Sequence, residues 1–289
     1  MMSGTPLGVV AAALKHITES VDLCPLPRSD SHTPIRVSGL ELPDVTRAFG
    51  RALVGVLAGA VRTDLRLAAR LLATGIDGRA EFVGNVRTLI GVDNDFGTAE
   101  AILFRDTKRN AWIAEGVLHI LLAVQDQASA DLLGGRIQAL RKVHTRPTQQ
   151  GFDAVALYQN GDELSIAIGE SKASREDGSG QLTEATQIFK HIDLGEYGLQ
   201  LRQELEALSE HLSDDLAAQV ASAVLKRLCY VPSIVHEKEF DPGKRRETLA
   251  RLRPAVDRKR LLVIQLQDFY GFFDSVADTM RDAVNEIVV

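Results

Sequence analysis

The chain has 289 residues, of which 45% are hydrophobic and 25% are charged, and its formal net charge is −6. This composition excludes a disordered chain and a uniformly basic nucleic-acid coat protein. Cys24 and Cys229 are too few and too distant for a disulfide framework or a zinc cluster. The longest apolar run near the N-terminus, 52–61, is well short of the roughly 20 residues of a membrane span. With no secretory signal pattern either, we expect a cytoplasmic protein.

Residues 1–98 are predicted to form a mainly helical N-terminal region whose role the sequence does not reveal. Hydrophobic spacing predicts a helix over 6–20, a short strand over 35–42 and a helical tract over 44–73. A polar stretch around 94–97 is the best candidate for a boundary. We therefore expect a second domain over 99–289.

The segment Asn110 to Val124 is predicted to be a buried helix with Asn110 as its N-cap. Apolar side chains lie around most of its circumference, and Glu115 sits in its middle. An unpartnered carboxylate in such a place costs several kcal/mol. Glu115 therefore needs a partner, which within the chain would be an arginine or His119, one turn further on.

A β-hairpin is predicted over 152–158 and 164–172, because Asn160-Gly161 is a strong two-residue turn signal between two strand-like runs. A register that pairs Gln159 with Asp162 places apolar residues opposite apolar residues on one face. The other face carries small residues, which would let a helix pack closely against the sheet. The sequence thus predicts an α/β fold with helices covering the sheet.

In this hairpin Asp153, Glu170 and Lys172 share the apolar face, with Asp153 diagonal to Glu170. Two carboxylates within reach of one ion suit Mg²⁺, and a nearby lysine could orient or help deprotonate a bound water. We therefore assign Asp153 and Glu170 as metal ligands and Lys172 as the residue that positions the attacking water. The alternatives are a solvated strand end, or a plain salt bridge between Asp153 and Lys172.

The rest of the chain is predicted to contain a helix over 181–192, helical structure over 200–228, a buried strand over 260–266 and a closing helix over 268–288. Basic residues gather over 244–260, where they could neutralise phosphates or form a solvated helix face. The candidate nucleic-acid contacts in that segment are Lys244, Arg245, Arg246, Arg258, Lys259 and Arg260. A smaller basic group over 136–146 is interpreted mainly as a solvated face.

Asp153 followed by Glu170-Ser171-Lys172 resembles the core of the PD-(D/E)XK nuclease superfamily. The stretch from about 111 to 192 resembles the HamA family, the nuclease subunits of Hachiman anti-phage defence systems, and the AbpA family is a related possibility. The strings Gly151-Phe152-Asp153 and Gly169-Glu170-Ser171-Lys172-Ala173 carry most of this likeness. No proline precedes Asp153, and no residue outside this stretch is matched.

The resemblance implies a restriction-endonuclease-like core, with a mixed central sheet flanked by helices, that cleaves DNA with Mg²⁺ or with Mn²⁺ as a substitute. It also implies a further acid from the preceding helix, so that Glu115 would complete a metal site with Asp153 and Glu170. A helicase partner of the HamB type is implied as well. The chain itself has no G-x-x-x-x-G-K-[ST] phosphate loop, so any ATP-driven motor would be another protein.

Two alternatives from other functional classes stay open. The chain could be a non-catalytic partner- or nucleic-acid-binding module that keeps the nuclease fold, or a structural or RNA-binding protein that uses the basic segment. The presence of all three core residues, Asp153, Glu170 and Lys172, favours the DNA endonuclease.

Overall fold

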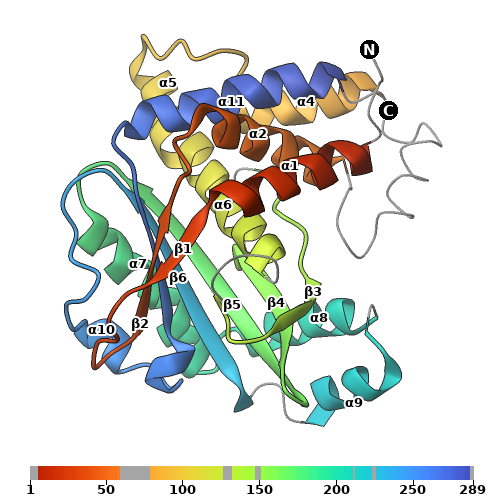
Figure 1. Cartoon of the computed structure of the whole chain (residues 1–289), viewed down its shortest axis with the longest axis vertical. Helices are drawn as coiled ribbons and strands as arrows, with labels where there is room; N and C mark the ends of the chain where they lie inside the picture. Colours follow the sequence, from red (N-terminus) through yellow and green to blue (C-terminus); the bar gives the residue numbers. More distant parts are fainter. Residues whose placement is uncertain are drawn as a thin grey trace.

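The computed structural model describes residues 6–58, 79–125, 132–146, 151–210, 212–222 and 226–286. Within these residues seven strands form one sheet, in the order β1-β2-β7-β6-β5-β4-β3 (Figure 1). The strands are β1 (Asp22–Pro25), β2 (Thr33–Ser38), β3 (Arg136–Leu140), β4 (Ala154–Asn160), β5 (Glu163–Ser174), β6 (Leu228–His236) and β7 (Arg260–Gln265). The pairs among β5, β6, β7 and β2 are parallel, whereas β1, β4 and β3 pair antiparallel with their neighbours. The sheet is therefore mixed, which confirms the mixed α/β class.

Helices cover both faces of the sheet (Figure 1). One apolar core packs α1, α2, α4, α6 and α11 against the sheet, and a second core packs α7 and α8 against the other face. The helices are α1 (Pro6–Ser20), α2 (Pro43–Leu57), α4 (Arg79–Ile90), α5 (Ala99–Phe104), α6 (Asn110–Val124), α7 (Gly178–Asp193), α8 (Gly198–Ser209), α9 (Asp214–Ser222), α10 (Glu247–Ala250) and α11 (Phe269–Glu286). None of the described helices combines the length and apolarity needed to cross a membrane.

The β4–β5 hairpin forms, but its predicted register is wrong by two residues. Leu157 pairs with Ile166 and Val155 with Ile168, because the turn consists of Gly161 and Asp162 rather than Asn160 and Gly161. Only Gly161 has a positive φ there, +59°, as a turn with glycine in its first central position requires. Since the shift is even, every side chain keeps its predicted face.

Close packing of a helix on the small residues of this hairpin is confirmed. A Cβ added to Gly169 would lie 2.8 Å from the Cδ2 atom of Leu118 in α6, closer than real contacts allow. The bounds predicted for α6 are also confirmed, but Asn110 is not its N-cap. The π-helical turn η1 (Arg105–Arg109) runs from α5 directly into α6, so Asn110 already has helical dihedral angles.

The region predicted to be helical over 200–228 is only partly so. It contains α8 and α9 and is followed by β6, a nearly continuous buried strand between β5 and β7. The predicted tract over 44–73 is helical as far as α2, and residues 59–78 lie outside the described part. Because β1 and β2 join the sheet and the α2 core includes α6, the two sides of residue 98 share one core. The boundary at that residue stays a prediction.

Candidate functional site

A cavity of about 350 Å³ opens where β4 begins and β5 ends, beside the middle of α6 and the loop after β3. Its charged and polar lining includes residues from each of these elements and from α7. Among these residues are Glu115, His144, Arg146, Asp153, Ser171, Lys172 and Glu184, and the lining also includes Asp106, Thr107 and Gln181. Three of the four residues assigned from the sequence, Glu115, Asp153 and Lys172, therefore line one cavity.

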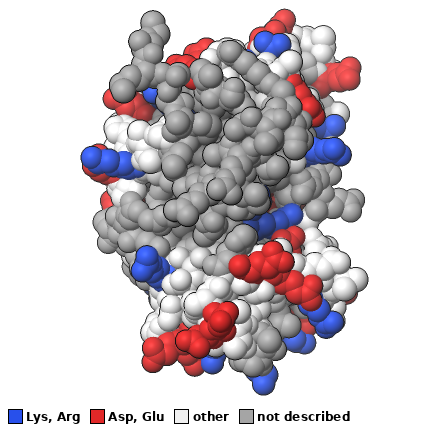
Figure 2. Space-filling view, turned by 90° about the vertical axis from the view of Figure 1, so that its right-hand side faces the viewer, with Lys and Arg blue, Asp and Glu red and all other residues white. Residues whose placement is uncertain are grey.

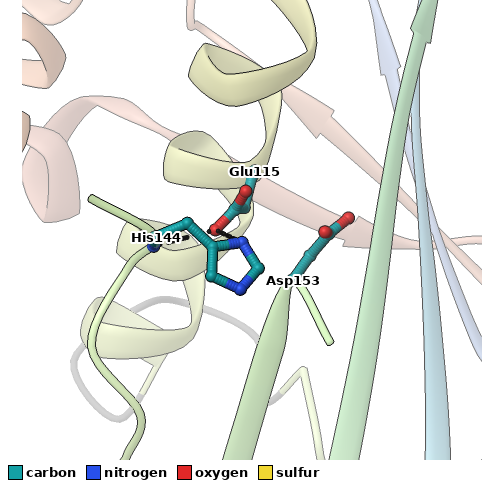
Figure 3. A group of neighbouring side chains, drawn as sticks. All are labelled: Glu115, His144 and Asp153. Carbon is teal, nitrogen blue, oxygen red and sulfur yellow. Dashed lines mark hydrogen bonds and ion pairs between the residues drawn. The ribbon is translucent and has the colours of Figure 1, made fainter. Parts of the chain in front are cut away.

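Glu115, His144 and Asp153 form a group of possible metal ligands in the described residues (Figure 3). One ligand atom from each lies within 4.8 Å of the other two. Glu115 projects from α6, and its Oε1 atom lies 2.8 Å from Nδ1 of His144. The same oxygen accepts the backbone N–H of His144 at 3.1 Å. The carboxylate buried in the predicted helix thus has a histidine partner, although it is not His119.

Asp153 lies one residue before the last ladder pair of β4, directly across from Glu170 rather than diagonal to it. Its Oδ2 atom accepts the backbone N–H of Ser171 at 2.7 Å. Burial raises the pKa of Asp153 well above its usual range, and the carboxylates of Glu170 and Glu115 raise it further. The N–H of Ser171 and the ammonium of Lys172 lower the pKa of Asp153, but they offset only part of this increase. The carboxylates of Asp153, Glu170 and Glu115 therefore lie close together, and a positive charge between them would be stabilised.

Glu170 and Lys172 form an ion pair, with Nζ of Lys172 3.1 Å from Oε1 of Glu170. Nζ also lies 3.3 Å from Oε1 of Glu184 on α7, a residue not singled out from the sequence. Burial lowers the pKa of Lys172, but Glu170 and Glu184 outweigh this effect and the pKa is raised overall. Lys172 therefore carries a positive charge at neutral pH, and its ammonium pairs with both carboxylates.

Burial also raises the pKa of Glu170, and the attraction of Lys172 offsets this only partly. The second oxygen of Glu170, Oε2, is buried and has no hydrogen-bond partner among the described residues. Oγ of Ser171 and Nε2 of His144 are in the same situation, and both residues line the cavity. Buried polar groups are normally satisfied. An unsatisfied imidazole nitrogen on a cavity-lining residue, together with the unsatisfied carboxylate oxygen of the neighbouring Glu170, fits a bound divalent cation.

His144 was missed because no local pattern links it to Glu115. It lies in the 136–146 segment, which was interpreted as a mainly solvated basic face, and it is only 4% exposed. The single sequence signal was the need of Glu115 for a partner. His119, the partner considered, is also buried, but its Nδ1 atom has no hydrogen-bond partner among the described residues.

The structure does not bring the six predicted nucleic-acid contacts of the 244–260 segment together as one exposed surface. Lys259 is only 3% exposed, and its ammonium group donates to the carbonyls of Leu249 at 2.9 Å and Leu252 at 3.4 Å. Its assignment to a nucleic-acid contact is therefore wrong, because a phosphate would not reach it. Arg246 packs over the ring of Phe240, with its guanidinium carbon 4.8 Å from the ring centroid.

The other four basic residues remain at least partly exposed, and Arg245 pairs with Glu247. A different face, shown in Figure 2, carries acidic side chains over its lower part, where α8 and α9 lie. Basic side chains lie among them in the same view.

Neither a protein-family model nor a curated protein sequence matches this chain. The chemical interpretation of the cavity is therefore based on the residues that line it.

Proposed function

We propose that this chain is a metal-dependent nuclease that hydrolyses phosphodiester bonds in DNA. The observation that carries the proposal is the convergence of Asp153 and Lys172 with Glu115 at one cavity, next to the buried and half-satisfied Glu170. This residue set resembles the core of the PD-(D/E)XK nucleases, which supports the proposal. A restriction-endonuclease-like core is part of the same proposal.

Glu115, His144 and Asp153 would hold the cation, with the free oxygen of Glu170 as a further ligand. A divalent cation lowers the pKa of a bound water and stabilises charge that develops on a phosphate. Lys172 is the cation that the chain itself supplies. Its ammonium donates hydrogen bonds toward the cavity and orients the attacking water, while Glu170 and Glu184 keep it in place.

The resemblance to Hachiman nuclease subunits extends the proposal to an effector in anti-phage defence that acts with a helicase. The absence of a phosphate-loop motif in the sequence supports a division of labour, because unwinding would then require a second protein. Cleavage that is weak for the isolated chain and increases when a cognate helicase is added is the expected behaviour.

The decisive experiment is cleavage of supercoiled plasmid by the purified chain, with and without the helicase, in the presence of a divalent metal or of a chelator. We expect Asp153→Asn to lower metal-dependent cleavage at least about 100-fold, since several kcal/mol of charge stabilisation would be lost. Glu206→Gln removes an exposed carboxylate of α8 and should cut like the wild type. Equal cleavage by Asp153→Asn and wild type would overturn the proposal. No cleavage under any condition would favour a non-catalytic binding module.

A further inference from the structure

His144 makes the ligand set of the cavity different from an all-oxygen site. Glu115 and Asp153 offer carboxylate oxygens, whereas His144 offers a ring nitrogen within the same 4.8 Å group. Glu115 and His144 are 6% and 4% exposed, so water competes little for either side chain. Nothing in the sequence pattern of the hairpin or of α6 foretells this nitrogen.

The position of His144 is fixed by contacts that do not depend on its own ring. Nε1–H of Trp112 donates to the backbone carbonyl of His144 at 2.8 Å, and the backbone N–H of His144 donates to Glu115. These bonds anchor the loop after β3 to two successive turns of α6. The imidazole is therefore held at the cavity in advance, and a substitution of its ring leaves the anchoring of the loop in place.

Two observations favour a ligand over a purely structural histidine. A structural histidine on a carboxylate is usually satisfied at both nitrogens, but Nε2 of His144 is buried without a partner among the described residues. Oγ of Ser171, on a residue that is 4% exposed and lines the same cavity, is also unpartnered. The contact of Nδ1 with Oε1 of Glu115, 2.8 Å long, orients the ring and leaves Nε2 as the nitrogen open to a ligand.

The hardness of the ligands determines which cation such a set prefers. Mg²⁺ favours oxygen ligands and retains several waters, whereas transition-series divalent ions accept imidazole nitrogen readily. We propose that this cavity selects a transition-series divalent cation, with Mn²⁺ as the reference ion, over Mg²⁺, and that His144 is the ligand responsible. This inference rests on the metal site of the proposed function, but it concerns binding and can be measured without DNA.

Calorimetric titration of the metal-free full chain with Mn²⁺ and with Mg²⁺ tests this inference. We expect Mn²⁺ to bind at least about tenfold more tightly than Mg²⁺. His144→Asp, which restores an all-oxygen set, should bring the two affinities within about threefold of each other. His191→Asn removes an imidazole on α7 that pairs with Glu196 outside the cavity, and it should keep the wild-type ratio. Equal affinities for Mn²⁺ and Mg²⁺ in the wild type, or an unchanged affinity ratio in His144→Asp, would overturn the inference. It would also be overturned if neither ion bound.

Two further measurements keep the outcome clear. Circular dichroism and thermal unfolding show whether His144→Asp folds, and His144→Asn, which is closer in shape and uncharged, replaces it if it does not. Plasmid cleavage at saturating metal then separates the two proposals. Tight Mn²⁺ binding without cleavage would retain the selectivity and remove the nuclease, whereas cleavage with equal affinities for both ions would do the reverse.

Discussion

The residues of the cavity and those of the 244–260 segment were both predicted to be functional because charged residues gather in each. In the structure, however, a lysine of the cavity and a lysine of the segment have different kinds of partner. Lys172 lies at a cavity between two carboxylates, one of which retains an unsatisfied oxygen. Lys259 is buried and donates to two main-chain carbonyls that end a short helical segment. A charged side chain next to a cavity and an unsatisfied polar atom indicates a ligand site. A charged side chain whose hydrogen-bond partners are all main-chain carbonyls has a structural role.

The sharpest way to test this contrast is to neutralise the lysine at the cavity. Lys172→Met should lower the turnover number for plasmid cleavage by about 10²–10³, since it removes the preorganised donor that orients the attacking water. Affinity for the metal should change little, because Lys172 is not a ligand. If the variant had the turnover number of the wild type, Lys172 would be a structural residue, as Lys259 is.

A buried histidine away from the cavity should affect stability without affecting chemistry. Burial lowers the pKa of His119 to about 4, with a smaller effect from Arg141. The unfolded chain therefore binds more protons than the folded chain between pH 6.5 and 4, and stability falls as the pH is lowered through this window. The loss from this group reaches about 3 kcal/mol at pH 4.

Urea unfolding of wild type and His119→Leu between pH 7 and 4 isolates this contribution, because all other groups titrate in both proteins. The free energy of unfolding of His119→Leu should fall less steeply over this range. Parallel curves for the two proteins would mean that His119 is not buried as a neutral ring. The rate of DNA cleavage at pH 7 should be the same in both.

The smallest expected effect concerns the lysine that serves the fold. Lys259→Met leaves the carbonyls of Leu249 and Leu252 without their donor and should lower the free energy of unfolding by about 1–2 kcal/mol. Affinity for DNA and its salt dependence should remain those of the wild type. A tenfold loss of DNA affinity at unchanged stability would return Lys259 to a nucleic-acid surface.

Local periodicity was sufficient to predict α6, α1 and the two faces of the β4–β5 hairpin, because each follows from spacing within about 15 residues. Strand β6 was missed for a physical reason. A central parallel strand is buried on both faces, so that it lacks alternation, and in β6 the apolar run is also interrupted by Pro232 and Ser233. The helical spacing of α8 and α9, directly before it, extended the predicted helix into its first residue.

The candidate site divides along the same line. Asp153, Glu170 and Lys172 are close because they belong to one hairpin, and that proximity could be predicted even though the register was wrong by two residues. His144 meets Glu115 across 29 positions through an irregular loop, and Glu184 reaches Lys172 from a helix that packs over the strand. Contacts of this kind depend on tertiary packing, so the hydrophobic periodicity of the sequence cannot predict them.

The glycine turn of the hairpin has a consequence for how the protein can change over evolution. It lies roughly 25 Å from Asp153 along β4, at about 3.3 Å per residue. Even so, the register set at the turn decides the face of every residue further along the strand. A slip of one residue would move Asp153 from the face it shares with Glu170 to the opposite one, whereas a slip of two would only slide the strand. Length variation at this distant loop is therefore compatible with the site only where the loop absorbs it or the register shifts by an even number of residues.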